Sequence, residues 1–399
     1  MKTKFQPRPA PASPTSSAAA ITRIVLHGAA TDVPESEWAL LDHGDDPFAS
    51  RAFLGTAEKV GAGGAAMGWQ AQHLALYEGD LLLGLLPLYL RSHSFGDFSR
   101  DWNWASAWQR AGLDYYPKLV SGMPYTPSPG PRLLVRRDAD RETVAPALIE
   151  AALEVVRQFG ASSWQCLFVE EEDRARLAAA GLLMRRGVQF HWFNRGYGDF
   201  DDFLAGFTAD KRKKLKRERR AVAESGLRLE ARHGDEIDAS LWQAMHRQYR
   251  DTFARYGNHP AFPLEFFVEA GRLLARRLVV FIAFLGEKPV ASAIGYRDAE
   301  TLYGRHWGTE IDLPGLHFEL CFYQGIDYCI RHGLRTFEPG AQGEHKLARG
   351  FEPVATWSAF WVAHEGMRRA VADFIVREDA AMQDYEAETT AHLPFKLAG

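Results

Sequence analysis

Residues 278–307 read LVVFIAFLGEKPVASAIGYRDAETLYGRHW, a segment in which apolar runs alternate with short charged turns. The apolar runs are Leu278–Leu285, Val290–Arg297 and Thr301–Trp307. Runs of about four to eight residues that are rich in branched and aromatic side chains and bounded by turn residues are typical of β-strands. The segment therefore predicts three consecutive strands joined by tight turns.

Helical patterns lie on both sides of these strands. The segments with helical periodicity are Phe200–Glu224, Leu241–Tyr256 and Leu264–Arg276 before the strands, and Leu316–Arg331 and Gly366–Glu378 after them. Two further strands, Thr336–Glu338 and Ala355–Val362, are expected near the end of the chain. Interleaved helices and strands of this kind predict an α/β fold.

The first half of the chain echoes the second. His73–Leu90 contains a strand, a charged glycine turn and a second strand, as Val279–Tyr296 does, and each half continues with a helix that ends in Gly-Leu. Shared order and spacing predict that one α/β unit is duplicated. We expect one unit over residues 21–195 and another over 196–380, with a C-terminal tail at 381–399. The Pro/Ala/Ser-rich residues 1–20 are expected to form a disordered tail.

Composition excludes several classes of protein. The chain has 399 residues with 47 Lys and Arg against 51 Asp and Glu, and the formal charge of −4 excludes a globally basic nucleic-acid coat. Cys166, Cys321 and Cys329 lack the spacing of a disulfide framework or a zinc ribbon. No apolar run is long enough to span a bilayer, and no secretion signal is visible. We therefore expect a cytoplasmic protein with no membrane span and no DNA partner; its oligomeric state stays open.

Familiar catalytic motifs are absent from the sequence. It contains no GxxxxGK[ST] phosphate loop, no GxGxxG after a strand and no GxSxG elbow, which disfavours a kinase, a dinucleotide oxidoreductase or a serine hydrolase. It also lacks HExxH and CxxC, so we expect no metal site and no tightly bound cofactor.

The most concentrated charge lies in KRKKLKRERR, residues 211–220, where only Glu218 opposes the basic side chains. A solvated helix face is one interpretation. The other is a site for a polyanion such as RNA, a CoA phosphate or a pyrophosphate-linked lipid. The donor- or anion-binding residues would then be Lys213, Lys214, Arg217 and Arg220.

A glycine-rich loop, FEPGAQGEHKLARGF, occupies residues 337–351. Its backbone at Gly343 can approach a ligand closely, and His345, Lys346 and Arg349 add polar groups. Exposed N–H groups and a Lys or Arg stabilise a developing oxyanion, and the loop directly follows a strand, where α/β proteins place ligands. The alternative is a turn whose charges face solvent.

Two histidine segments come next in interest, His306-Trp307 and Leu316-His317-Phe318-Glu319. His317 and Glu319 fall near a predicted helix N-terminus, whose dipole lowers the proton affinity of a histidine, so either residue could serve as a base. His317 could equally be a capping or packing residue.

An aromatic cluster in the first half includes Trp104, Tyr115 and Tyr116 beside Lys118. Its irregular, proline-rich surroundings favour a loop that lines a substrate groove, together with His306 and Trp307. Core packing is the alternative, because aromatic residues at this density are usually buried.

The basic run, the strand meander, HWG at 306–308, LHFELCFYQGIDYCIRHGL at 316–334 and the 337–351 loop together resemble the FemAB-like branch of the GNAT acyltransferase superfamily. The resemblance covers residues 21–378 and implies two tandem GNAT-like domains. It also implies transfer of an acyl or aminoacyl group from acyl-CoA or aminoacyl-tRNA to an amine. The acceptor would be a small molecule, a peptide or a cell-wall precursor.

In better-known FemAB relatives a lysine precedes a Gly-Phe pair in the second domain, and Lys346 before Gly350-Phe351 is the matching position. The chain lacks the Q/RxxGxG/A pyrophosphate loop of acetyl-CoA users and the coiled-coil arm of aminoacyl-tRNA users, so the donor stays open. We expect catalytic roles for Lys346, His317, Glu319 and His345. The rival hypothesis is a non-catalytic protein that binds RNA or phospholipid through the basic helix.

Overall fold

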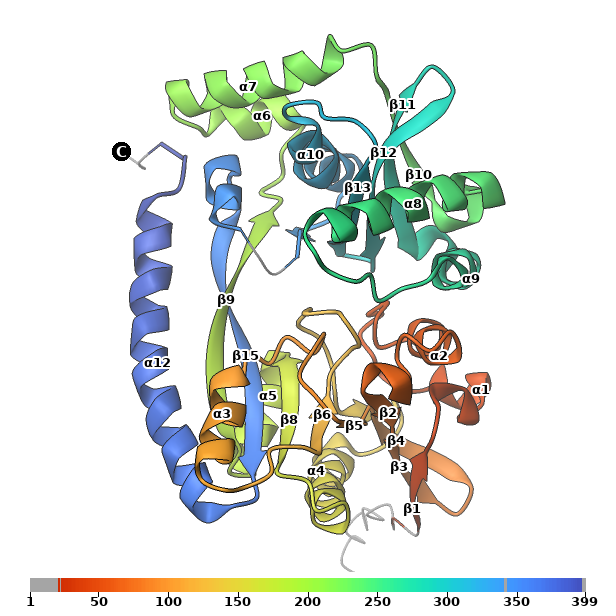
Figure 1. The fold of residues 1–399 in the computed structure, drawn as a ribbon, viewed down its shortest axis with the longest axis vertical. Helices are drawn as coiled ribbons and strands as arrows, with labels where there is room; N and C mark the ends of the chain where they lie inside the picture. Colours follow the sequence, from red (N-terminus) through yellow and green to blue (C-terminus); the bar gives the residue numbers. More distant parts are fainter. Residues whose placement is uncertain (1–20, 22, 341–342, 397–399) are drawn as a thin grey trace, which may run out of the picture.

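The computed structural model of the chain describes residues 21, 23–340 and 343–396, so the predicted tail at 1–20 lies outside the described residues. The protein consists of two lobes connected by two long strands, β9 and β15 (Figure 1). We call residues 23–182 the first lobe and residues 194–340 with 343–349 the second lobe. Among the described residues, no helix is both long and apolar enough to cross a bilayer.

The first lobe contains β1 (Arg23–His27), α1 (Glu35–Trp38), α2 (Arg51–Lys59), β2 (Trp69–Ala71), β3 (His73–Glu78), β4 (Leu81–Leu86), β5 (Tyr89–Arg91), α3 (Trp102–Arg110), β6 (Lys118–Ser121), β7 (Leu134–Val135), α4 (Arg141–Gln158), β8 (Ser163–Val169) and α5 (Glu171–Ala179). The second lobe contains α6 (Phe200–Ala205), α7 (Ala209–Ala223), β10 (Arg228–His233), α8 (Ala239–Arg255), α9 (Leu264–Leu274), β11 (Leu278–Leu285), β12 (Lys288–Arg297), β13 (Thr301–Thr309), α10 (Leu316–Phe318), α11 (Gln324–His332) and β14 (Thr336–Glu338). Residues outside these lobes form β9 (Leu183–Phe193), β15 (Glu352–Val362) and α12 (Glu365–Ala391).

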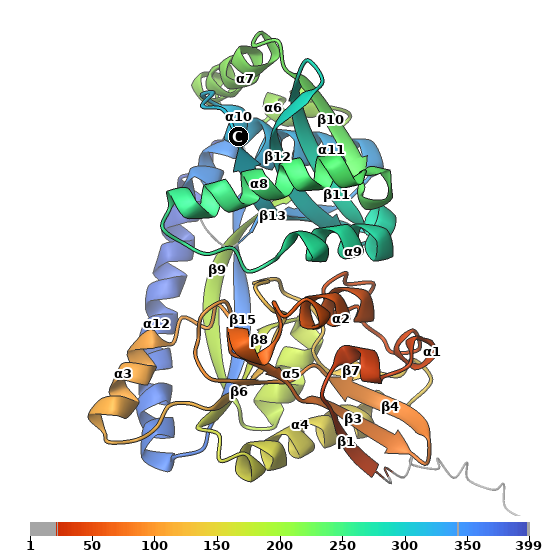
Figure 2. The same cartoon turned by 45° about the vertical axis from the view of Figure 1, so that its right-hand side comes forward.

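The predicted meander is confirmed as β11, β12 and β13, which pair antiparallel in sequence order. They belong to one sheet with the strand order β10-β11-β12-β13-β14-β9-β15-β8-β6-β5-β2, while β1, β3, β4 and β7 form a second sheet. The large sheet passes from one lobe to the other through β9 and β15, as the turned view shows (Figure 2).

Strand β15 returns from the second half of the chain to the first lobe. It pairs antiparallel with β9 from Glu352↔His191 to Phe360↔Leu183, and its far edge pairs with β8. The opposite end of β9 pairs with β14 in the second lobe. A division of the chain near residue 195 therefore stays a prediction, and the sheet itself runs across it.

Strand β9 begins at Leu183, and its Arg185 and Arg186 form ion pairs with Glu378 and Asp379 on α12. Two expected elements have different limits in the structure. Helix α12 continues to Ala391, so much of the expected tail at 381–399 is helical.

The expected single helix over Phe200–Glu224 is two helices. Helix α6 ends at Ala205, and α7 begins at Ala209 after Thr208. The connecting Phe207 is fully buried and packs against Phe395 from the C-terminal end of the chain. The helix is interrupted at Phe207, whose backbone pairs with Phe395 and whose side chain is buried between the two helices.

Aromatic packing joins the lobes. Phe48 of the first lobe lies edge-on to Tyr296 and Tyr303 of the second, with ring centroids 5.1 and 5.2 Å apart. Phe53 packs in the same way on Phe266 at 5.6 Å. Phe48 is fully buried and Phe53 is nearly so, which makes the contact part of a core that both lobes share.

We expect Phe48→Ala to reduce the free energy of unfolding by about 3–5 kcal/mol, the range for truncating a buried Phe. Urea denaturation followed by tryptophan fluorescence measures this loss. The control is Phe95→Ala, at a side chain that is 45% exposed, which should change stability by no more than about 0.5 kcal/mol. Equal effects of the two substitutions would show that the lobes do not depend on this contact.

Candidate functional site

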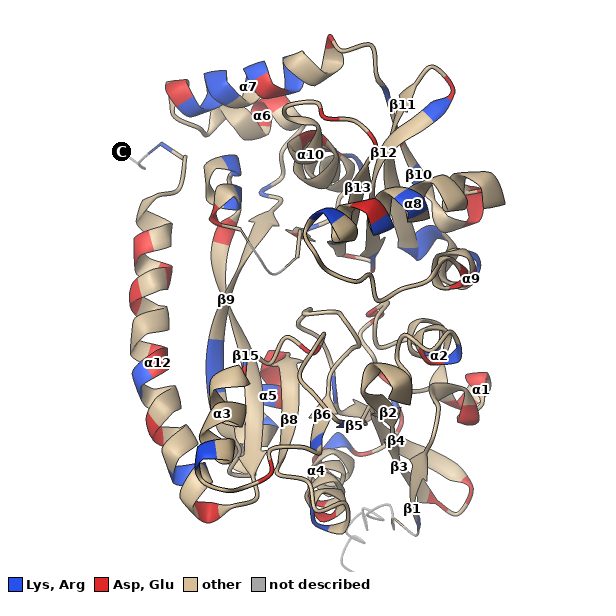
Figure 3. Cartoon of the chain, viewed as in Figure 1, with Lys and Arg blue, Asp and Glu red and all other residues tan. Residues whose placement is uncertain are grey.

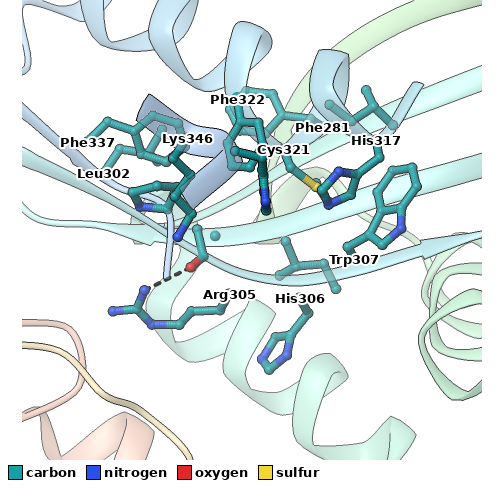
Figure 4. A pocket seen from close by; sticks show the side chains of 17 residues that line it. Phe281, Leu302, Arg305, His306, Trp307, His317, Cys321, Phe322, Phe337 and Lys346 are labelled. Atoms are coloured by element: carbon teal, nitrogen blue, oxygen red, sulfur yellow. Dashed lines mark hydrogen bonds between the residues drawn. The ribbon is translucent and has the colours of Figure 1, made fainter. Parts of the chain in front are cut away.

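A cavity opens in the second lobe where β13 and β14 separate. The two strands pair in parallel only from Thr301↔Thr336 to Tyr303↔Glu338. Beyond these pairs Pro339 cannot donate a ladder hydrogen bond, and Gly340 with φ 93° turns the chain away. The space holds about 190 Å³ and is covered by α10 and the π-helical segment Glu319–Tyr323 (Figure 4).

The deep wall of the cavity is apolar and its mouth is polar. The apolar side chains include Phe281, Leu302, Leu320, Phe322 and Phe337. Arg305, Trp307, His317, Cys321, His345 and Lys346 supply the polar or ring atoms. Small organic ligands are usually held by this combination of an apolar pocket and a few polar groups.

Close backbone approach shapes the cavity floor. The pairing of β12 with β13 shifts register between Ile294 and Gly295, which leaves Arg305 as an extra residue in β13. A Cβ on Gly295 would lie 2.7 Å from the Tyr303 carbonyl oxygen, so only glycine fits there. At the bulge, Arg305 reaches Glu338 on β14 and lies over the Phe48 ring, while His306 packs on Phe267. Phe48 and Phe267 belong to one core cluster, so the two neighbouring side chains lie on the same side of the sheet.

Lys346 brings a buried amine to the cavity. It lies in the 3₁₀ segment Glu344–Arg349, only 2% of the residue is exposed, and Nζ donates to the carbonyl oxygen of Gly340. An ammonium has three donors, and two of them have no hydrogen-bond partner among the residues that the structure describes. Burial lowers the pKa of Lys346 to about 8, with Arg305 lowering it further and Glu338 opposing the shift.

Of the three histidines that line the cavity, His317 and His345 lie on the helical segments that cover it, and the pKa of each is lowered. Burial, helped by His345 and nearby cations, lowers the pKa of His317 to about 4. Its ring packs edge-on to Trp307 at 5.2 Å and to Phe322 at 5.5 Å. His345 is exposed at the mouth and contacts Phe318 and Phe322. The neutral His317 ring therefore forms part of the cavity wall. Neither of its ring nitrogens takes part in a hydrogen bond within the described residues.

Glu319 and Arg349 turn away from the cavity toward α7. Glu319 is 3% exposed and accepts hydrogen bonds from Arg219, at 3.2 Å, and from Gln324, at 2.8 Å. Arg349 donates to Glu218 at 3.0 Å, and its guanidinium lies 3.3 Å from the centroid of the Phe318 ring. Both charges attach α7 to the segments around the cavity, and the expected roles of Glu319 as base and of Arg349 as donor-binding residue stay predictions.

Helix α7 has an inner face and an outer face. Leu215, Glu218, Arg219 and Val222 face the lobe. The outer face exposes Lys213, Lys214, Arg217 and Arg220, so the strongest run of positive charge covers one end of the protein (Figure 3). None of these four cations is within an ion-pair distance of an acidic side chain in the described part of the chain.

Two cavity neighbours escaped the sequence analysis. Glu338 and Arg305 form an ion pair of 2.9 Å beside Lys346. Glu338 ends the short strand before Pro339-Gly340, and an acidic residue at the carboxyl end of a strand was a readable signal. Arg305 gave no such signal in the sequence, because the direction of its side chain depends on a bulge that forms only when β12 and β13 pair.

Comparison with known proteins agrees with this architecture. The family model for FemAB-like proteins, described as peptidoglycan biosynthesis/recognition, matches residues 29–397. The chain belongs to the FemAB-like family. No curated protein sequence matches it.

Solved structures resemble this FemAB-like chain at low identity. FemX has a TM-score of 0.51 at 11% identity, over 88% of this chain and 100% of its own. L-PGS from Bacillus licheniformis has 0.51 at 14%, over 86% and 97%. The C-terminal domain (DUF2156) of a putative lysylphosphatidylglycerol synthetase from Agrobacterium fabrum has 0.53 at 12%, over 87% and 95%. The expected mixed α/β fold is thus confirmed over most of the chain.

The first-lobe aromatic cluster of this FemAB-like protein is largely buried. Trp104 and Tyr115 are each 5% exposed, and Trp104 packs on Phe360 of β15. Tyr116 is half-buried and shares a hydrogen bond with the Ser94 hydroxyl. Phe360 of β15 and Phe374 of α12 cover Trp104, so the groove expected at these residues stays a prediction. Of the residues expected to line it, only His306 and Trp307 line the second-lobe cavity.

Lys118 is fully buried within a polar network of the first lobe. Its ammonium contacts Asp97 at 2.9 Å, Asp101, Ser94 at 2.8 Å and Gln165 at 3.2 Å. Burial alone would raise the pKa of Asp101, but Lys118 and hydrogen bonds hold it well below its usual range. Every side of the ammonium is therefore occupied by protein groups.

Within the described ranges, no group of three His, Cys, Asp or Glu side chains is arranged to hold a metal ion.

We expect Lys118→Met to destabilise the protein by about 3–5 kcal/mol at pH 7, because it leaves Asp97 and Asp101 buried without their cation. A depressed carboxyl pKa contributes stability above the unfolded pKa of about 4, and this contribution is lost as pH falls through the folded pKa. The difference from wild type should therefore persist down to about pH 4 and shrink as the pH falls further below 4. Urea titrations at pH 7 and at a pH below 4, with the exposed Lys288→Met as control, measure it; no loss at pH 7 would indicate a groove residue.

Proposed function

We propose that this protein transfers an acyl or aminoacyl group from an activated donor to an amine, with Lys346 binding the reacting carbonyl oxygen. The family and the fold suggest aminoacyl or acyl transfer in general. The observation that carries the proposal is a buried ammonium that lines a cavity between two separating strands and has one hydrogen-bond partner among the described residues.

Charge balance around Lys346 supports an anionic reaction intermediate. Lys346 and Arg305 are cations and Glu338 is an anion, while His317 and the buried His191 are neutral because burial lowers the pKa of each to about 4. One positive charge thus stays uncompensated among these buried groups. An oxyanion formed in the cavity would balance it, and an electrostatic contact of this kind strengthens as negative charge develops on oxygen.

The reaction follows from this placement. The neutral amine of the acceptor attacks the donor carbonyl carbon, a C–N bond forms, and the carbonyl oxygen becomes an oxyanion held by Lys346. Collapse of this intermediate breaks the C–O bond of an aminoacyl ester or the C–S bond of a thioester. The proton lost by the amine passes to the leaving group, and we assign the neutral ring of His317 as the hydrogen-bond acceptor that orients the amine.

The donor and acceptor classes follow from different observations. Aminoacyl-tRNA and acyl-CoA both carry phosphates that suit the outer face of α7. The family description, which refers to peptidoglycan, favours an amine on a cell-wall precursor as acceptor over a free small molecule or another peptide.

We expect Lys346→Ala to lower kcat/KM by about 100- to 1000-fold, equivalent to about 2.7–4 kcal/mol of transition-state stabilisation, while the protein stays folded. Turnover is measured with a panel of acyl-CoA and aminoacyl-tRNA donors and an amine acceptor. The matched control is Lys288→Ala, an exposed lysine on β12. Once wild-type turnover is found with any donor, an unchanged rate for Lys346→Ala would refute the assignment.

A second candidate function is polyanion binding by α7 alone, favoured by the four exposed cations of its outer face. Binding through about four phosphate contacts on single-stranded nucleic acid would give a log–log salt slope near −3, at about −0.7 per contact. CoA has fewer phosphates and should give a shallower slope.

We expect Lys213→Glu/Lys214→Glu to abolish most tRNA binding and to flatten its salt dependence, as measured by fluorescence anisotropy across a salt series. The control is Lys59→Glu/Lys288→Glu, which makes the same change in net charge at exposed sites away from α7. A purely non-catalytic binder would lose its function in the α7 variant and be indifferent to Lys346→Ala. If neither tRNA nor CoA binds at low salt, the outer face of α7 is a solvated surface and not a polyanion site.

A further inference from the structure

A buried ion pair closes the gap between the separating strands. The guanidinium of Arg305 on β13 lies 2.9 Å from the carboxylate of Glu338 at the end of β14, and their side chains are 4% and 2% exposed. Arg305 and Lys346 line the same cavity (Figure 4). Glu338 lies two residues before Gly340, whose carbonyl oxygen accepts a hydrogen bond from Lys346 Nζ, where the two strands part. The ion pair therefore bridges the place at which the strand hydrogen bonds stop.

The first lobe covers this pair from two directions. The Ser128 hydroxyl donates to the Glu338 carboxylate at 2.7 Å, and the Phe48 ring lies 4.8 Å from the Arg305 guanidinium. The Ser128 carbonyl in turn accepts a 2.7 Å hydrogen bond from the buried Arg132. Lobe contact thus holds both members of the pair in place.

Stability alone does not account for such a pair. Removing two charges from water costs several kcal/mol per ion, and apolar residues of similar size often replace a buried pair with no loss. A charge pair at this position is instead suited to act on a third charge that is also shielded from water, since electrostatic interactions strengthen at low local dielectric.

We propose that Arg305 and Glu338 are positioning residues whose ion pair, held by the first lobe, sets the protonation state of the Lys346 amine. The proposal rests on the function assigned to Lys346 above. Glu338 favours the ammonium and Arg305 disfavours it, so the pair keeps the amine charged while leaving it close to its titration point.

The other groups that face Lys346 do not compete with the pair for this role. Cys321 on the π-helical segment is a thiol, because burial raises its pKa. His191 on β9 and His317 on α10 are neutral at pH 7. On the segment of Lys346 itself, His345 has a lowered pKa, and Arg349 is paired with Glu218. Glu338 and Arg305 are therefore the charges on neighbouring strands that act on the amine.

Opposite substitutions should have opposite effects. Glu338→Gln removes the attracting charge and leaves Arg305 unopposed, so the pKa of Lys346 should fall from about 8 by about one unit or more. Arg305→Met removes the repelling charge and should raise that pKa by a similar amount. Arg305→Lys keeps the charge and is the matched control, with little change expected.

The test measures the amine directly in the full chain. Trace labelling with acetic anhydride, which reacts with neutral amines, is followed across pH 6–11, and the peptide containing Lys346 is quantified by mass spectrometry. The exposed Lys213 is the internal standard, and its labelling should be the same in all variants. Shifts of the Lys346 midpoint in opposite directions support the proposal. An unmoved midpoint, or shifts in the same direction, would overturn it.

Failure of the proposed function would look different. If the labelling midpoints move in opposite directions but the alkaline limb of kcat/KM does not follow them, the pair controls Lys346 and Lys346 is not the oxyanion ligand. If Glu338→Gln does not fold, Arg305→Met compared with Arg305→Lys still decides, because the two differ chiefly in charge.

Discussion

The pairing of β9 with β15 is the constraint on which the rest of the structure depends. Because Glu352–Phe360 lies antiparallel along Leu183–His191, a strand from the end of the chain is inserted between β9 and β8. The two lobes therefore share one sheet and cannot separate without breaking its central ladder. Helix α12 reinforces the arrangement through ion pairs from Arg185 and Arg186 to Glu378 and Asp379. Because the lobes are joined in this way, Phe48 and Ser128 of the first lobe can contact Arg305 and Glu338 of the second.

The cavity is a consequence of strand geometry. Two parallel strands pair over three residues and then part, and a proline, a positive-φ glycine and a bulge prevent the gap from closing. Into this gap the protein places a lysine, an arginine and a glutamate, shielded by apolar walls and by Phe48 and Ser128 of the other lobe. The same desolvation that makes these charges costly also strengthens the electrostatic interactions among them.

Helix α7 divides its charges between two tasks. Arg219 and Glu218 attach the helix to Glu319, Asp327 and Arg349, which lie on the segments around the cavity. The lysines and arginines of the outer face stay in solvent. A ligand bound to the outer face would therefore be linked to the cavity through one helix and a short chain of buried ion pairs. The structure connects the two most basic features of the sequence, the 211–220 run and the 337–351 loop.

The sequence by itself determined the α/β class, the meander, the exposed basic helix and the position of Lys346, because these depend on local periodicity and on glycine and charge patterns. It also carried the family resemblance that the family model confirms. Tertiary structure decided the rest. Lys118, Trp104 and Tyr115 became core when β15 and α12 folded back over them, and Glu319 and Arg349 turned to α7 because buried charges must find partners. Arg305 and Glu338 are in contact only because the bulge in β13 and the end of β14 face each other across the gap. The local sequence does not predict this contact.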